Sequence, residues 1–142
     1  MSVIFKKNMR GTTLAATLLV ATALCGCSSN LMGTESERMV EYTVVGTDDL
    51  PEEFRKQIDE SKTDVMKLTY KDNEYLYIAE GYGTKDTGGY SISVDQLYVQ
   101  DKAIYFDSSL IKPGEDEKIS NQPSYPYIVI KTELSEMPVV FK

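Results

Sequence analysis

Few of the residue types that usually carry catalytic chemistry are present in this chain. It contains no histidine and no tryptophan, and its two cysteines, Cys25 and Cys27, lie close together near the start. Acidic residues are plentiful, but no pattern pairs two carboxylates for acid–base catalysis. The acidic run from Glu115 to Glu117 lacks the alternating ligands and central glycine of an EF-hand loop, which favours a solvated surface loop. We expect no enzyme activity, no catalytic residue, no cofactor and no metal site.

A glycine-rich stretch is the most constrained part of the sequence. Four glycines fall between residues 81 and 89, and a strict alternation of apolar and polar residues begins at Tyr90. Glycine suits a backbone that needs a positive φ or a close approach, and the alternation is typical of a half-buried strand. One hypothesis is that a shaped loop on a β scaffold contacts a partner through Thr87, Gly88, Gly89 and Tyr90. The other is that the stretch only connects two strands.

The first 26 residues have the pattern of a secretory signal peptide. Three basic residues, Lys6, Lys7 and Arg10, precede an uncharged run from Gly11 to Ala23. That run is shorter than the roughly 20 apolar residues of a spanning helix. It is followed by Leu24-Cys25-Gly26-Cys27, which resembles the lipobox of bacterial lipoproteins. The resemblance implies cleavage after residue 26, acylation of Cys27, and anchoring on the extracytoplasmic face of a bacterial membrane.

The charge of the remaining chain limits its partners. Without residues 1–26, twelve basic and 22 acidic residues remain, a net charge of −10. That balance disfavours nucleic acid and anionic lipid head groups, so the membrane contact would be made by the lipid on Cys27. Residues 27–38 are polar and aperiodic, which predicts a flexible tether. Residues 39–142 are enough for one domain.

One helix is expected, from Asp48 to Lys62. Asp49 and Glu52 have the spacing of a capping box, and Pro51 is tolerated in a first turn. Apolar residues recur every fourth position along this segment, which predicts a face that packs on the core. These residues are Leu50, Phe54 and Ile58.

The rest of the pattern predicts strands. A first strand is expected over residues 39–45, a hairpin over 66–79, and a strand from Tyr90 that extends as far as residue 99. Further strands are expected over 103–106, 125–131 and 137–141, the last at a sheet edge. Residues 108–124 read as a long surface loop. About seven strands and one N-terminal helix indicate a mainly β (α+β) fold, either a small β-sandwich or a partly open barrel.

Two motifs give the chain a family resemblance. Residues 87–92 (Thr-Gly-Gly-Tyr-Ser-Ile) and 124–131 (Ser-Tyr-Pro-Tyr-Ile-Val-Ile-Lys) resemble the C-terminal domain of the PrcB family, over about residues 75–131. Lys85-Asp86 departs from the family, which has a proline-bearing approach there. The family is named for a lipoprotein subunit that accompanies and stabilises a surface protease. The resemblance implies a non-catalytic accessory protein that binds and stabilises or modulates a secreted or surface protein, plausibly a protease.

The tyrosines and the glycine loop leave alternatives open. Tyr125 and Tyr127 could offer a recognition edge, or Tyr127 could simply face the core beside Pro126. Exposed tyrosines could also form a platform for cell-wall glycan. Finally, residues 87–90 are reminiscent of the loop that chagasin-type inhibitors insert into cysteine proteases, which would make the chain a protease-inhibitor-like module.

Overall fold

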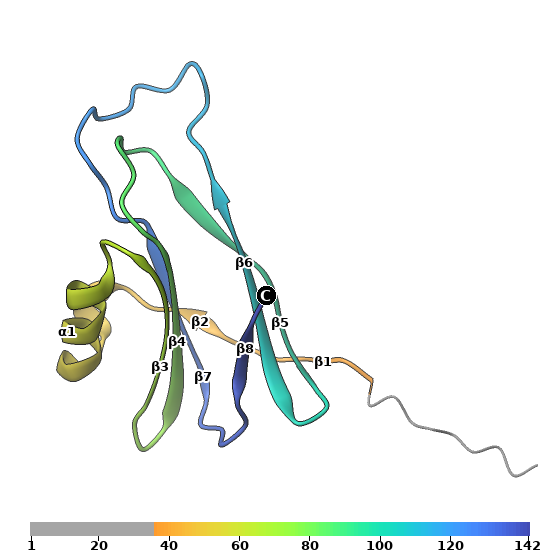
Figure 1. Cartoon of the computed structure of the whole chain (residues 1–142). Helices are drawn as coiled ribbons and strands as arrows, with labels where there is room; N and C mark the ends of the chain where they lie inside the picture. Colours follow the sequence, from red (N-terminus) through yellow and green to blue (C-terminus); the bar gives the residue numbers. More distant parts are fainter. Residues whose placement is uncertain (1–35) are drawn as a thin grey trace, which may run out of the picture. The chain divides into compact units, whose positions relative to one another are not determined.

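The computed structural model describes residues 36–142, in which two β-sheets and one α-helix form three layers (Figure 1). The predicted signal peptide, Cys27 and most of the predicted tether lie outside the described residues. Over the part of the chain that the structure describes, the expectation of a mainly β, sandwich-like α+β fold is confirmed, with eight strands in place of about seven and with no closed barrel. Within residues 36–142, no helix is long and apolar enough to cross a membrane.

Each sheet has four strands. The first has the order β1-β5-β6-β8, and the second has the order β2-β7-β4-β3. Every pair is antiparallel except β6 with β8. The strands are β1 (Arg38–Met39), β2 (Thr43–Val44), β3 (Val65–Lys71), β4 (Tyr75–Tyr82), β5 (Ser91–Gln100), β6 (Ala103–Ile111), β7 (Tyr127–Glu133) and β8 (Val139–Phe141).

The sheets are held together by a cluster of aliphatic and aromatic side chains. Alternate residues of a strand face opposite sides of its sheet, so Leu76 and Ile78 of β4 and Ile130 of β7 face the other sheet. They meet Leu97, Ile104 and Phe106 there, and all six are at most 1% exposed. Burying each such side chain stabilises the fold by about 1.5–3 kcal/mol.

Helix α1 (Glu52–Ser61) covers the outer face of the second sheet (Figure 1). Leu50, Phe54 and Ile58 are all buried against it, as their spacing predicts. The Phe54 ring packs in a cluster with two strand tyrosines, with centroids 5.3 Å from Tyr70 and 6.1 Å from Tyr77. The predicted capping box is wrong, however. A 3₁₀ turn (Thr47–Asp49) precedes the helix, whose N-cap is Pro51, and no side chain caps it.

The predicted first strand is also wrong in one respect. Residues 39–45 do not form one strand, because β1 pairs with β5 in the first sheet while β2 pairs with β7 in the second. The chain crosses from one sheet to the other between residues 40 and 42. The β-branched and aromatic residues therefore predicted an extended backbone correctly. They did not predict the crossing, because it depends on which strands pair with each half of the segment.

The hairpins follow the predicted pattern. At the β3–β4 turn, Asp72 Oδ1 accepts the backbone N–H groups of Glu74 and Tyr75 at 2.8 and 2.7 Å. These two bonds hold the pKa of the Asp72 carboxyl below its usual value. Asp101 and Lys102 turn β5 into β6 with φ of 49° and 61°, as in a type I′ turn. β6 continues to Ile111, so the predicted loop from residue 108 begins at 112 instead.

Candidate interaction surface

The glycine-rich stretch forms the connection between β4 and β5. Gly81 and Tyr82 belong to β4, so the loop itself is residues 83–90. Gly89 is exposed, and Thr87, Gly88 and Tyr90 are partly exposed. The four residues predicted to contact a partner are therefore accessible together at one place on the molecule.

This loop is braced by the connection between β6 and β7, residues 112–126. Lys85 and Ser124 exchange two backbone hydrogen bonds of 2.9 Å, and the Gly88 N–H donates to the Ser120 carbonyl at 2.9 Å. The Ser124 hydroxyl donates to the Thr87 carbonyl at 2.6 Å. The two connections thus form one unit, here called the loop tip (residues 83–90 and 112–126), at the upper end of the view in Figure 1.

The loop tip needs glycine at position 89. Gly89 has a φ of +86°, and a Cβ there would lie 2.7 Å from Ile119 Cγ2 and 2.9 Å from Pro113 Cβ. Gly88 has no such constraint, because its Cβ would lie 3.4 Å from the nearest atom, Ser120 Cβ. One glycine of the pair is thus required by the architecture, whereas the other leaves a bare backbone at a partly exposed position.

Exposed apolar and charged side chains meet at the loop tip. Ile119 is 38% exposed and Tyr125 is 39% exposed, and Ile111 at the end of β6 is 49% exposed. Residues 115–117 are exposed carboxylates, as the prediction of a solvated acidic loop implies. Such a surface, partly apolar and rimmed by charge, has the composition of a protein contact.

The two predicted recognition tyrosines differ in their surroundings. Tyr127, on β7, is partly buried against the helix-side core, and its hydroxyl lies 2.8 Å from Thr47 Oγ1. Tyr125 lies just before β7 and is more exposed, with Lys62 Nζ 5.9 Å from its ring centroid. Tyr125 is therefore available at the loop tip, whereas Tyr127 is largely occupied by packing.

A polar network fixes the strands beneath the loop tip. Glu80 of β4 is 5% exposed, and its carboxylate accepts a 2.7 Å hydrogen bond from the Ser108 hydroxyl of β6. Tyr82 donates to the Ser108 carbonyl at 2.8 Å, and burial raises the pKa of its phenol. Lys67 Nζ lies 3.5 Å from the Glu80 carboxylate. These contacts connect the two sheets directly below the loops and give the loops a rigid base.

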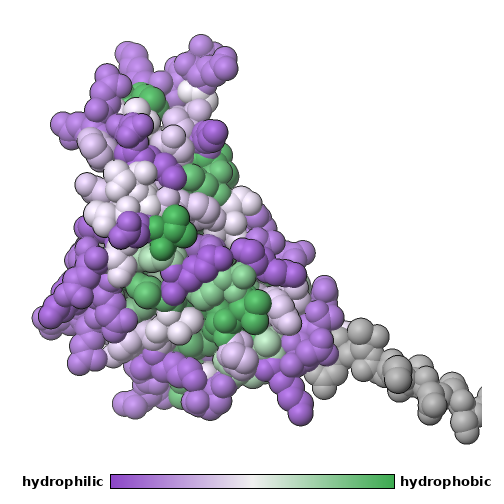
Figure 2. Space-filling model, viewed as in Figure 1, coloured by the Kyte–Doolittle hydropathy of each residue, from purple (hydrophilic) through white to green (hydrophobic). Residues whose placement is uncertain are grey.

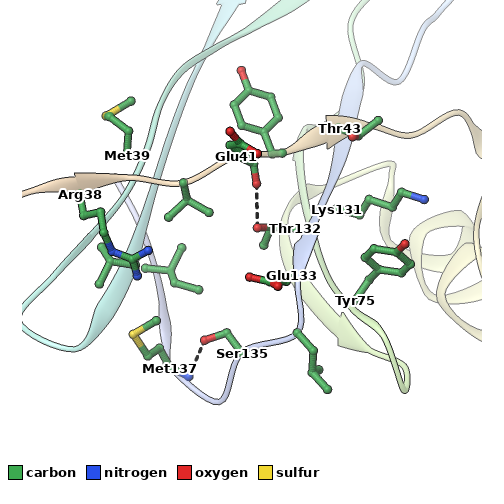
Figure 3. A pocket seen from close by; sticks show the side chains of 15 residues that line it. Arg38, Met39, Glu41, Thr43, Tyr75, Lys131, Thr132, Glu133, Ser135 and Met137 are labelled. Atoms are coloured by element: carbon green, nitrogen blue, oxygen red, sulfur yellow. Dashed lines mark hydrogen bonds between the residues drawn. The ribbon is translucent and has the colours of Figure 1, made fainter.

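A groove of about 1030 Å³ lies lower on the molecule, around the crossing of residues 40–42 (Figure 3). Arg38, Glu41, Lys131 and Glu133 line it together with apolar residues. Thr132 donates a 2.8 Å hydrogen bond to the Glu41 carbonyl, which holds the crossing segment in place. The opposite charges lining this groove select no single ligand.

The face drawn in Figure 2 is mostly hydrophilic, with hydrophobic residues gathered at its middle.

Tyr75 and Tyr77, two of the tyrosines close to the glycine loop in sequence, do not form an exposed surface for stacking. Tyr77 is 5% exposed, and Tyr75 and Tyr77 pack edge to face with ring centroids 6.3 Å apart. Burial and a hydrogen bond to Asp72 raise the pKa of Tyr77 to about 12. These rings are part of the sheet-helix core and of its border.

Comparison with known families places the loop tip in context. The sequence model described as PrcB C-terminal matches residues 76–133. This part of the chain belongs to the PrcB family. The PrcB region runs from β4 to the end of β7 and includes both loops of the tip and both motifs on which the resemblance depends. Neither a curated protein nor a solved structure matches the chain.

Several residues that shape the loop tip could not be predicted from the sequence pattern. Ile119, Ser120 and Ser124 brace the glycine loop, but each lies at least 30 positions beyond the loop residue that it contacts, in a stretch read as plain surface loop. Glu80 was also missed, because a single acidic residue in an apolar strand gives no sign of a partner on another sheet. The only signal available was the isolated Ile119 in an otherwise polar loop.

Proposed function

We propose that this chain is a non-catalytic accessory protein of a protease complex, held at the extracytoplasmic face of a bacterial membrane by lipid on Cys27. It binds a secreted or surface protease through the loop tip and stabilises or restrains it. The observation that carries the proposal is the PrcB match over residues 76–133, since the family is named for an accessory subunit of a protease complex.

The placement of the loop tip supports a contact role. Residues 83–90 and 112–126 come from two distant parts of the PrcB region and are joined by backbone hydrogen bonds. Their accessible side chains include the apolar Ile119 and the aromatic Tyr125. A braced loop loses little conformational entropy on binding, which favours recognition of a folded partner.

The direction of the strands supports a role away from the membrane. The described chain enters at β1, where Arg38 is opposite Val99 near the lower end of β5. Ser91, at the other end of β5, adjoins the glycine loop. Ten strand residues span roughly 30 Å. A lipid anchor preceding β1 would thus leave the loop tip facing outward, where a secreted protein can reach it.

Charge reversal at the loop tip tests the proposal. Asp86 is an exposed loop residue, and Glu74 is an exposed acidic residue at the β3–β4 turn. Asp86→Arg and Glu74→Arg change the charge equally, so they separate a local contact from general electrostatics. Each affinity-tagged full-length chain would be incubated with the secreted fraction of its own organism, and eluates would be examined by casein zymography and mass spectrometry.

We expect the native chain and Glu74→Arg to retain a protease, and Asp86→Arg to lose most of it. The caseinolytic activity of the eluate, compared with the same amount of free protease, then distinguishes stabilisation from inhibition. Equal retention by both variants would remove the loop tip from the interface. Retention on isolated cell wall without any protease would favour glycan binding instead.

A further inference from the structure

One edge of β5 is unpaired next to the loop tip. β6 pairs with β5 along its whole length, from Ser91 opposite Ile111 to Gln100 opposite Ala103. On the other edge, β1 pairs only with Tyr98 and Val99, and the Val40 N–H donates to the Leu97 carbonyl at 2.9 Å. Among residues 36–142, no strand pairs with residues 91–96 on that side.

The backbone of this segment directs polar groups toward the open edge. In an antiparallel sheet, successive residues direct their N–H and C=O groups to opposite neighbours. On β6, Ile104 and Phe106 bond to the β8 side, at 2.8 and 3.0 Å. Ser109 and Ile111, which have the other parity, therefore bond to Ser93 and Ser91 of β5. Ile92 lies between Ser91 and Ser93, and Val94 follows Ser93. Ile92 and Val94 therefore present their N–H and C=O groups to the open edge of β5.

The edge of the second sheet at β3 is less suited to receive a strand. β3 forms the edge of the second sheet and carries Lys67 and Lys71, and lysine protects edges against added strands. Residues 91–96 contain no lysine or arginine, and a bulge after Val94 marks the lower limit of the regular segment. The same edge already holds β1 further down, which shows that its geometry accepts an antiparallel strand.

The surroundings of the edge determine what it can bind. Residues 83–96 and 107–126 contain the carboxylates Asp86, Asp95, Asp107, Glu115, Asp116 and Glu117, against the three cations Lys85, Lys112 and Lys118. Ile92 and Val94 are only partly buried, so an added strand would cover apolar surface as well as pair the backbone. The edge is also continuous in sequence with the glycine loop.

From these observations we propose that the β5 edge, residues 91–94, binds an extended, positively charged segment of the partner protein by strand addition. Main-chain hydrogen bonds to Ile92 and Val94 supply the affinity, and the surrounding carboxylates select basic side chains. The proposal rests on the proposed function, because it names the part of the partner that the loop-tip region recognises. A second copy of this chain fits less well, since antiparallel pairing of two β5 edges would direct the two β1 ends, where the chains enter, away from each other.

Proline substitution tests the edge directly. Proline has no N–H and is tolerated at the open edge of a strand. Ile92→Pro removes the donor that faces the open edge of β5. Leu110→Pro is the matched control, because Leu110 is opposite Ile92 and its N–H faces the other edge of the same pair of strands. Ile92→Ala controls for the loss of the side chain while keeping the donor.

The probe is a capped synthetic peptide, Lys-Val-Thr-Val-Lys-Val, titrated into the isotope-labelled full chain in detergent and followed by NMR and amide hydrogen exchange. In the free chain, the Ile92 and Val94 amides should exchange fast while those of Ser91 and Ser93 are protected. The peptide should slow exchange at Ile92 and Val94. Ile92→Pro should weaken binding about tenfold, because the peptide carbonyl loses its donor. Leu110→Pro and Ile92→Ala should each change it about threefold or less. A peptide with glutamate in place of lysine should bind more weakly than the lysine peptide.

Three results would overturn the proposal: peptide shifts that map elsewhere, equal binding by Ile92→Pro and Ile92→Ala, or protected Ile92 and Val94 amides in the free chain. If that protection increased with protein concentration, a second copy would be the occupant. The protease pull-down separates this proposal from the proposed function. Undiminished protease retention by Ile92→Pro, with loss by Asp86→Arg, would remove strand addition and leave the loop-tip contact standing.

Discussion

Replacing either of the two adjacent loop glycines with alanine is the same chemical change, but we expect very different losses of folding stability. Gly89→Ala adds a methyl group at a φ of +86°, 2.7 Å from Ile119 Cγ2 and 2.9 Å from the Pro113 ring. Gly88→Ala adds the same group where the nearest atom, Ser120 Cβ, is 3.4 Å away. Neighbouring positions in one loop share the same solvent and the same sequence context, so the comparison isolates the backbone and the crowding.

The magnitudes follow from these two terms. A left-handed conformation costs an alanine about 1–2 kcal/mol, and overpacking against a rigid proline ring adds about 1–3 kcal/mol. Ile119 is a loop side chain that can move in part, so we expect a loss of about 2–3 kcal/mol for Gly89→Ala. Gly88→Ala should change stability by about 0.5 kcal/mol or less, since alanine also restricts the unfolded chain.

The assay is equilibrium unfolding in urea, followed by circular dichroism, with a parallel thermal melt. For a domain of this size, a loss of about 2 kcal/mol lowers Tm by roughly 8 °C or more. An unchanged denaturant slope would show that the shift in the unfolding midpoint reports a change in stability. Equal stability of the two variants would refute the idea that Gly89 is fixed by its contacts with Ile119 and Pro113.

Three further outcomes follow from the structure. Phe54→Ala removes a fully buried ring that packs on two tyrosines and should cost about 3–5 kcal/mol in urea unfolding, while the exposed Gln57→Ala should cost under about 1 kcal/mol. Tyr77 has a folded pKa raised to about 12, so its contribution is fully present below about pH 10 and is lost as the pH rises toward 12; Tyr77→Phe should flatten the wild-type loss of stability in that window. Cys27→Ser should release the chain into the medium or leave an unprocessed precursor, detected by membrane fractionation and intact mass, whereas unchanged fractionation and mass would refute acylation.

Local pattern was sufficient for much of the fold. The four-residue spacing of Leu50, Phe54 and Ile58 specified the buried face of the helix, because burial of a helical stripe depends on periodicity alone. The alternation from Tyr90 likewise specified β5, since side chains on a strand alternate between its two faces. The turn at Asp101 and Lys102 followed from the short polar stretch between two apolar runs.

Features that depend on distant partners were not predictable in this way. The crossing of residues 40–42 arises because β1 and β2 pair with different sheets, and no local propensity encodes that choice. The prediction of Asp49 as the cap was wrong because the N-cap is Pro51, two residues later than the capping box requires. The continuation of β6 through Ser108 was not predicted, because two consecutive serines are typical of a loop. The hydrogen bonds of Ser108 to Glu80 and Tyr82, which hold it in the strand, cannot be read from the sequence.

The sequence pointed to only one of the two loops that make up the candidate site. Thr87, Gly88, Gly89 and Tyr90 lie together and accessible, as the glycine pattern suggested. The other half of the loop tip, residues 112–126, becomes part of the site only through long-range contacts such as Ser124 to Thr87. Sequence spacing therefore identified a loop, and the three-dimensional structure identified the second loop that gives it a fixed shape.

Amide hydrogen exchange of the full chain, alone and with the protease proposed as its partner, tests the central claim most directly. Complex formation should slow amide exchange in residues 83–90 and 112–126 and leave exchange in the β3–β4 turn around Glu74 unchanged. Protection confined to that turn or to the groove around residues 40–42, with the loop tip exchanging as in the free chain, would contradict it.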